Sequence, residues 1–502
     1  MLSPGTNTVH LKSIMIQRLH SAAGLLLSFV IIMTSMMRGA KRNPLAGDRR
    51  IHDAGANDRP SLIPADTAAH ANTIPPEKAP FQSLPPLRMV VLLGLLALTI
   101  SVARVAAIRS DREFFGQGYM YKEIAITLAH GRGYTEPHGP WRGRPTVMRA
   151  PLWPFVLSLP MRICPQCGSI PVTQYSAAFM HAVTAFGVAI LVWMVSGSRR
   201  RMLLAFGVAV LLPEVQPLMM GGFCEPLSAA ILVIGTLLIC RGGRFFWGGV
   251  FLLSLLPLVR PNFLPLWAVV MVLIWWLQFR GKSGSVFGGK RRLIAAALLF
   301  YIPSTVWVAR NYFVSGAFPV LAGTASTTFY GNYNPLSATP GPDFGRWVDP
   351  NHIPGQEKIE SLSLRMSEPE TLRYYDAKGK EFVRQHWKIV PLLITAHVVF
   401  AALPSPADGA HKYSFWLFRL VLYAATLMAI RQKSIRLNSW FGVLVMGAVL
   451  SSATTVVLYS GEGRYLYPLN ILLLVLAFAA YAPFGKQRTR FQVTNSPLGD
   501  VS

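Results

Sequence analysis

The chain has 502 residues, of which 52% are hydrophobic and only 14% are charged, and its mean hydropathy is +0.39. A soluble domain carries about 25% charged residues, so this composition excludes an ordinary soluble protein and indicates a membrane protein. The formal net charge of +26 comes from 48 Lys and Arg against 22 Asp and Glu. Because basic residues cluster in short connections between apolar runs, and no nucleic-acid-binding motif is visible, we expect no nucleic-acid partner.

Residues 1–86 differ from the rest of the chain. The apolar run Ala22–Met37 follows Lys12 and Arg18 and is short for a membrane span, so it fits a signal or anchor segment. Residues 38–86 are rich in Pro, Ala, Asp and Arg and are typical of a disordered linker. A start codon assigned upstream of the true one would give the same pattern. We therefore treat 1–86 as an N-terminal extension and assign it no function.

Residues 87–485 contain repeated apolar runs long enough to cross a bilayer. Backbone groups in lipid must bond within their own segment, so these runs predict helices and an all-α polytopic membrane protein. The predicted spans, ten in number, are 87–108, 174–195, 202–219, 223–240, 245–259, 262–279, 293–310, 413–431, 439–459 and 465–483.

The basic connections set the orientation of these spans. They place both ends of the core and the tail 486–502 in the cytoplasm, and they leave the loops 109–173 and 311–388 outside. Ser367 and Glu370 have the spacing of a capping box, which predicts a helix from residue 368 to 388 at the membrane surface. The short apolar run Ile389–Leu403 is interpreted as interfacial or re-entrant, because a further crossing would move the basic loop 431–436 outside.

The first outer loop is rich in Arg and Lys, on the side where such residues are normally scarce. An anionic lipid headgroup would explain them, since guanidinium groups match phosphate oxygens. The alternative is that long loops translocate whatever their charge. The same loop contains a lone CPQC segment, so Cys164 and Cys167 form either a local disulfide or two ordinary thiols.

Five short segments together resemble the GT-C superfamily of membrane glycosyltransferases. They resemble most closely the family 39-like branch that holds protein O-mannosyltransferases and the lipid A aminoarabinose transferase. In chain order, the segments are YKEIAITLAHGRGY with RAPLWP (121–134 and 149–154), CEPL (224–227), VRPN (259–262), WVARNY with a later Gly-Asn (307–312 and 331–332), and GRYLYP (463–468).

This resemblance implies a GT-C-like bundle of about ten transmembrane helices over 87–485, whose outer loops carry short interfacial helices. It implies an enzyme that moves a sugar from a polyprenyl-phosphate donor to an extracytoplasmic glycan, lipid or protein. The expected partners are the polyprenyl-phosphate-linked sugar and membrane lipids, and the expected location is a bacterial inner membrane with the active site facing outward. No cofactor is expected. The need for a divalent metal stays open, although the sequence contains no compact cluster of His and Asp that would indicate a metal site.

The catalytic acid is where the chain departs from the family pattern. The family's usual acidic position corresponds to Gln117, and an alternative position seen in some relatives corresponds to Met120. Asp111 and Glu113 lie just beyond the first span, so we predict that one of them is the general base. The alternative for Asp111 is a purely structural role, in which it forms a surface ion pair with a neighbouring Arg.

The remaining site residues are assigned by their motifs. We expect Arg149 to contact the donor phosphate, joined by Arg310, Arg464 and Arg260 on the outer side of the membrane. Arg149 could instead be an interfacial side chain, and Arg260 could instead pair with Glu225. The predicted substrate cavity comprises Tyr121, Glu123, His138, Glu225, Asn311 and Asn332.

Two other functions fit parts of the sequence. A transporter or flippase of lipid-linked sugars would show inverted repeats and charges at the bilayer midplane. No convincing repeat is visible here, and the charges gather at one face. A catalytically inactive homologue that acts as a scaffold would explain the absence of an acid at Gln117 and Met120.

Overall fold

The computed structural model of the chain describes residues 84–108, 117–139, 141–279, 290–316, 321–402, 412–431, 439–458 and 462–480. Nearly all of the N-terminal extension and the whole of the tail 486–502 lie outside these ranges. Within them the secondary structure is helical, and the described extended pairing is one isolated bridge between Thr135 and Pro145. The predicted all-α class is therefore confirmed for this part of the chain.

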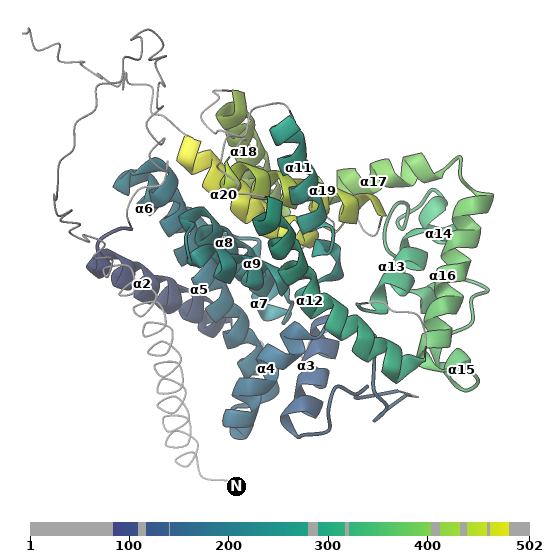
Figure 1. The fold of residues 1–502 in the computed structure, drawn as a ribbon. Helices are drawn as coiled ribbons and strands as arrows, with labels where there is room; N and C mark the ends of the chain where they lie inside the picture. The colour runs from purple at the N-terminus through teal and green to yellow at the C-terminus, as the bar shows by residue number, and fades with distance from the viewer. Residues whose placement is uncertain are drawn as a thin grey trace, which may run out of the picture.

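The larger body of the molecule is a bundle of apolar helices (Figure 1). In chain order they are α2 (Leu87–Ile108), α5 (Ser169–Ser196), α6 (Arg199–Val210), α7 (Val215–Met220), α8 (Glu225–Arg241), α9 (Phe245–Ser254), α10 (Leu256–Val259), α11 (Leu266–Phe279), α12 (Lys290–Ser315), α18 (Lys412–Arg431), α19 (Trp440–Leu458) and α20 (Tyr467–Ala480).

Five of the described helices are long and apolar enough to cross a membrane by themselves: α2, α5, α12, α18 and α19. The structure thus supports a helical membrane protein but does not confirm the predicted number of ten spans. Three predicted spans are interrupted, and a proline lies at or beside each interruption: Pro213 between α6 and α7, Pro257 at the second position of α10, and Pro265 directly before α11. Proline has no N–H to donate and ends a helix that hydropathy alone would read as continuous.

Helix α8 lies at the centre of the bundle. All of its residues except Ile234 and Arg241 are buried, as expected of a helix that is apolar on every side. It crosses α9 closely because both helices carry glycine at the crossing. A Cβ on Gly235 would lie 2.5 Å from Leu253, and one on Gly249 would lie 2.8 Å from the carbonyl oxygen of Gly235. Small residues allow backbones to approach in this way between membrane helices.

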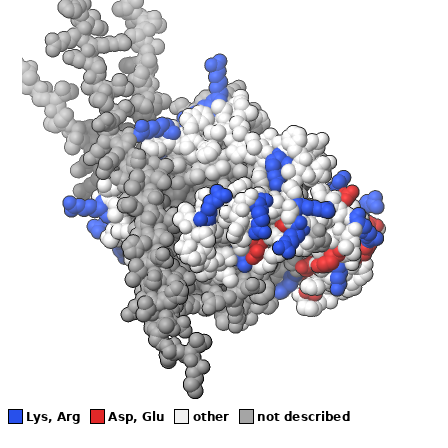
Figure 2. Space-filling view, turned by 90° about the horizontal axis from the view of Figure 1, so that it is seen from below, with Lys and Arg blue, Asp and Glu red and all other residues white. Residues whose placement is uncertain are grey.

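The predicted outer loops carry short helices. The first contains α3 (Gln117–Ala129) and α4 (Leu152–Ile163), and Gly131, just after α3, has a φ of 74°, which glycine adopts without strain. The second contains α13 (Thr324–Asn332), α14 (Pro335–Ala338), η4 (Pro350–His352), α15 (Ile359–Ser363) and α16 (Glu368–Gln385), which gather at one end of the molecule in Figure 1. Figure 2 shows most of the acidic side chains on its visible face at this end.

The second outer segment fulfils one prediction and leaves another open. Helix α16 has the expected capping box, in which Ser367 and Glu370 bond each other's backbone, and it ends at Gln385 rather than at residue 388. It is followed by α17 (Val390–Ala402), a 13-residue apolar helix that packs against α19 and against η6 (Gly463–Leu466). A helix of this length is too short to span a bilayer, so the interfacial or re-entrant placement stays a prediction.

The two outer segments are joined by backbone pairing. The amide of Gly323 donates to the carbonyl of Val147 at 2.8 Å, and the amide of Thr324 donates to that of Met148 at 3.1 Å. Leu372 of α16 packs on Val147 and Met148. The first outer loop is therefore held between the helix bundle and the second outer segment.

The cysteines resolve one alternative. Cys164 and Cys167 form a disulfide at the end of α4, where the sequence left both a disulfide and free thiols open. Cys224 and Cys240 are free and buried, as expected for residues within apolar runs.

Candidate functional site

The bundle and the first outer loop meet at three arginine side chains, which we call the arginine cluster: Arg149, Arg260 and Arg464. Arg260 is buried, and Arg149 and Arg464 are half-buried. Arg149 precedes α4, Arg260 lies in the extended turn between α10 and η2 (Pro261–Phe263), and Arg464 lies in η6 before α20. Each of them comes from a separate sequence motif, more than 100 residues from the next.

Arg260 forms a buried ion pair with Glu225, the first residue of α8. Its Nη1 lies 2.7 Å from the Glu225 Oε1, and its guanidinium lies 4.1 Å from the centre of the Tyr465 ring. The pairing that the sequence offered as an alternative role for Arg260 is thus present. The other carboxylate oxygen of Glu225, Oε2, has no hydrogen-bond partner among the described residues.

Arg464 extends this pair into a network. Its Nε lies 2.5 Å from the Glu462 Oε2 and 3.9 Å from the Glu225 Oε1, and its guanidinium stands 4.5 Å from the centre of the Phe223 ring. Glu225 and Glu462 therefore supply two negative charges to the cluster, and Arg260 and Arg464 supply two positive charges that offset them.

Arg149 makes no ion-pair contact in the part of the chain that the structure describes, although the Glu136 carboxyl acts on it from a longer distance. Its Nη2 lies 2.8 Å from the Met120 sulfur, its guanidinium lies 5.9 Å from the centre of the Tyr121 ring, and its Nε is buried without a hydrogen-bond partner. Burial lowers the pKa of Arg149 from its usual value. A partly buried cation without an ion-pair contact is costly, so this group is the member of the cluster best placed to accept an anion.

Tyr121 and Cys224 close the cluster on the α3 side. The Cys224 thiol donates to the Tyr121 hydroxyl at 3.7 Å, and burial raises the pKa of Tyr121 well above its usual value. The phenol is therefore neutral and available as a hydrogen-bond donor. Trp153 of α4 fixes the facing turn by donating from its Nε1 to the carbonyl of Gly222 at 3.0 Å.

Arg310 binds the outer loop rather than the carboxylates of the cluster. Its Nη1 donates to the carbonyl of Thr146 at 2.6 Å, and its Nη2 donates to the carbonyl of Tyr134 at 3.2 Å. Its guanidinium also lies 4.8 Å from the centre of the Trp307 ring. The structure thus gives Arg310 a bracing role on the polar turn between α3 and α4.

The other predicted cavity residues are spread over two places. Glu123 pairs with Lys122 at 2.9 Å and with the Nε2 of His138 at 3.1 Å, at the exposed rim of the first outer loop. Asn311 and Asn332 are buried and donate to the carbonyls of Leu321 and Thr328 within the second outer segment. The proposed bases Asp111 and Glu113 lie outside the described residues, as does the side chain of Gln117.

The sequence analysis missed two buried acids in the predicted outer loops, Glu136 and Glu368. The Thr146 hydroxyl donates to the Glu368 Oε1 at 2.8 Å and also bonds Glu136. Burial raises the pKa of Glu368 to about 7, and it raises the pKa of Glu136 as well. Only the fold brings these residues together, because more than 200 positions separate them.

A second missed feature is the buried ion pair of Glu214 and Arg419. The Asn470 amide donates to Glu214 at 3.1 Å, and the Arg419 Nη1 donates to the carbonyl of Ala401 at 2.9 Å. Arg419 packs so closely on Gly463 that a Cβ there would collide with the guanidinium. Glu214 lies on the segment that leads to Glu225, and Gly463 is next to Arg464. The Glu214–Arg419 pair therefore fixes the segment before Glu225 relative to the segment that contains Arg464.

The described residues contain no group of three or more His, Cys, Asp or Glu side chains that could hold a metal ion. No protein-family model matches this sequence, and no curated protein matches it significantly.

We predict that Glu214→Gln destabilises the protein strongly. It leaves the Arg419 charge buried and uncompensated, which costs about 3–5 kcal/mol, and the melting temperature of the detergent-purified chain should fall accordingly. Glu381→Gln is the matched control, because Glu381 pairs with Lys378 on the surface and such a pair contributes about 0–1 kcal/mol. The double variant Glu214→Gln/Arg419→Gln should recover part of the loss, and purely additive losses would contradict a coupled pair.

We also predict that Glu368→Gln alters the pH dependence of stability. The folded pKa of about 7 lies above the ordinary 4.5, so the protonated carboxyl stabilises the fold fully below about pH 4.5, and this stability is lost as the pH rises through 7. The loss is about 3 kcal/mol at most. The variant cannot ionise and should therefore lose less stability than wild type between pH 5 and pH 8. Parallel melting curves for the two proteins would contradict the prediction, and exposed Glu360→Gln is the control.

Proposed function

We propose that this protein is a GT-C-like membrane glycosyltransferase that moves a sugar from a polyprenyl-phosphate donor to an extracytoplasmic acceptor. The observation that carries the proposal is the arginine cluster, in which the Arg149 Nε is buried without a hydrogen-bond partner beside two further guanidinium groups. Arg149 has no carboxylate in ion-pair contact among the described residues, although Glu136 acts on it from a longer distance. A phosphate group supplies charge and acceptor oxygens in a geometry that guanidinium fits.

The origin of the cluster residues supports the same proposal. Arg149, Glu225, Arg260 and Arg464 come from four of the segments that resemble the family, and Tyr121 opens the first of them. Segments that resemble family motifs and meet at one buried polar site are better explained by a shared function than by packing, for which apolar residues would be sufficient.

The chemistry would be a displacement at the anomeric carbon of the donor sugar. The acceptor hydroxyl forms the new C–O bond, while the bond to the phosphate oxygen breaks and its electron pair leaves with the lipid phosphate. Arg149, with Arg260 and Arg464 behind it, stabilises the charge that grows on that phosphate. The proton of the acceptor hydroxyl passes to a carboxylate, for which Asp111 and Glu113 remain our candidates.

The membrane arrangement extends this proposal. We propose that the three interrupted helix pairs, together with α8 and α20, also cross the bilayer, which restores about ten spans, and that the arginine cluster faces the outside of a bacterial inner membrane. The Cys164–Cys167 disulfide supports an outward position of the first loop, because disulfides persist mainly in oxidising compartments.

We predict that Arg149→Ala, and one of the two variants Asp111→Asn and Glu113→Gln, abolish transfer from labelled polyprenyl-phosphate sugars by the purified protein in nanodiscs. Removal of one charge-stabilising donor lowers a rate by about 100-fold to 1,000-fold, and Arg149→Ala should do at least this. Arg142→Ala, an exposed arginine of the same loop, is the matched control and should transfer normally.

The contrary outcomes separate the alternatives. Normal transfer by Arg149→Ala would remove the proposed phosphate contact. Absence of transfer by a folded wild-type protein that still binds the lipid would favour an inactive homologue or a transporter, consistent with Met120 standing against Arg149 where an acid could have stood.

A further inference from the structure

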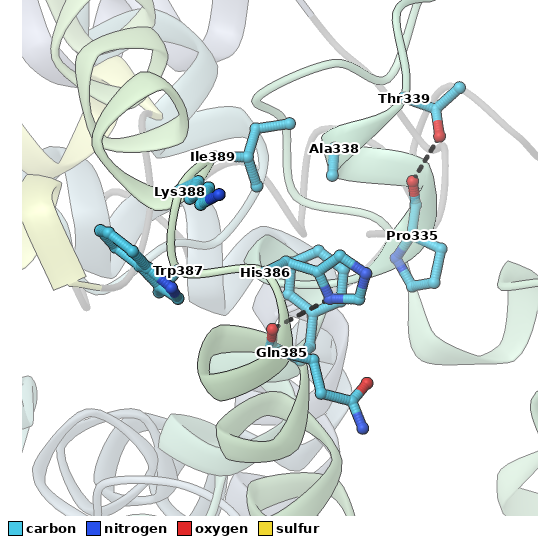
Figure 3. A pocket seen from close by; sticks show the side chains of 9 residues that line it. Pro335, Ala338, Thr339, Gln385, His386, Trp387, Lys388 and Ile389 are labelled. Carbon is cyan, nitrogen blue, oxygen red and sulfur yellow. Dashed lines mark hydrogen bonds between the residues drawn. The ribbon is translucent and has the colours of Figure 1, made fainter.

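A cavity of about 530 Å³ lies in the second outer segment, away from the arginine cluster. It is bounded by α14, by the last turn of α16 and by the turn that leads into α17 (Figure 3). Its polar lining residues are Thr339, Gln385, His386 and Lys388, with Trp387 at one edge. None of these residues belongs to the site proposed above, so the cavity needs an explanation of its own.

The hydrogen bonds around this cavity fix what its polar groups offer to a ligand. The His386 ring stacks on Phe382 with centres 4.5 Å apart, and its Nδ1 lies 3.1 Å from the Phe382 carbonyl oxygen. A carbonyl only accepts, so Nδ1 carries the proton, and in the neutral ring Nε2 is left as an acceptor. The Thr339 hydroxyl donates to the Pro335 carbonyl at 2.7 Å, so its oxygen also remains an acceptor.

Gln385 adds a group of mixed character. Its Nε2 donates to the Glu381 side chain at 3.2 Å, which leaves its Oε1 to accept and its second N–H to donate. The cavity also adjoins the C-terminal end of α16, where the helix dipole is negative. Lys388 also lines the cavity and brings three N–H donors, so the lining presents both acceptors and donors.

This pattern discriminates between classes of ligand. An anion would be attracted by Lys388, but it would also face the lone pairs of His386 and Thr339 and the negative end of α16. A hydrocarbon chain would leave these polar groups unpaired, which costs free energy. A ligand rich in hydroxyl groups satisfies them, because each hydroxyl both donates and accepts. The Trp387 side chain, 65% exposed, adds a broad flat ring on which the apolar face of a sugar can stack.

We propose that this cavity binds a neutral glycan, and that this glycan is the acceptor of the transfer reaction. The second half of the inference rests on the proposed function, whereas the first half does not. The position of the cavity fits an acceptor that must reach the arginine cluster. Ile389 in the cavity wall leads directly into α17, and α17 packs on η6, the short helix that contains Arg464.

The test measures binding of neutral tetrasaccharides (cellotetraose, mannotetraose and chitotetraose) to the full chain in nanodiscs by microscale thermophoresis. Short-chain phosphatidylglycerol is the anionic comparison. We expect saturable binding of at least one tetrasaccharide, weakened about tenfold by Trp387→Ala and similarly by His386→Phe. Trp387→Phe should retain most of the affinity, and Leu364→Ala, which changes an exposed side chain outside the cavity, should retain all of it.

Absence of binding to all three tetrasaccharides, binding unaffected by Trp387→Ala, or binding of phosphatidylglycerol alone would each overturn the inference. The same titrations in the Arg149→Ala background separate it from the proposed function. Glycan binding should persist there although transfer is lost. If wild type transfers sugar but Trp387→Ala changes neither glycan binding nor transfer, only the assignment of the cavity is wrong. If Trp387→Ala loses glycan binding but wild type transfers no sugar, only the proposed transfer function is wrong.

Discussion

Burial of guanidinium groups is the constraint on which the rest of the structure depends. Charged side chains removed from water cost several kcal/mol each unless they are paired and bonded. Glu225 and Glu462 meet this cost for Arg260 and Arg464, with the Tyr465 ring beneath Arg260. Among the described residues Arg149 contacts a sulfur atom and aromatic rings, and the Glu136 carboxyl acts on it only from a longer distance. The Arg149 guanidinium therefore has no carboxylate in contact, and the proposed phosphate would supply its missing hydrogen-bond acceptors.

The interruptions of the helices follow from the same constraint. The extended conformation of Arg260 between α10 and η2 interrupts an apolar run and brings a charged side chain to the cluster. Non-helical backbone within a membrane bundle is tolerated where it is buried in protein or lines a cavity. The non-helical segment before α8 is also fixed by a buried charge. Glu214 pairs with Arg419, which packs on Gly463, and Glu225 then begins α8. The packing of α8 and α9 supplies the rigid support on which these turns rest.

The sequence predicted the helical class, the capping box of α16 and a span beginning near the CEPL segment, where α8 starts. It overestimated the continuity of the spans, because hydropathy does not register the breaks near Pro213, Pro257 and Pro265. It also missed the pairs of Glu214 with Arg419 and of Thr146 with Glu368, since each joins residues more than 200 positions apart. The grouping of Arg149, Arg260 and Arg464 followed from motif resemblance, whereas the separate bracing position of Arg310 required the fold.

The most direct test of this account is a cryo-EM structure of the chain in nanodiscs with a bound polyprenyl phosphate. The account predicts phosphate density within hydrogen-bonding distance of the Arg149 guanidinium, with its Nε engaged and the Arg260–Glu225 pair intact beside it. Phosphate bound elsewhere, with Arg149 still resting against Met120, would contradict the claim that this cation is kept for an anionic lipid headgroup.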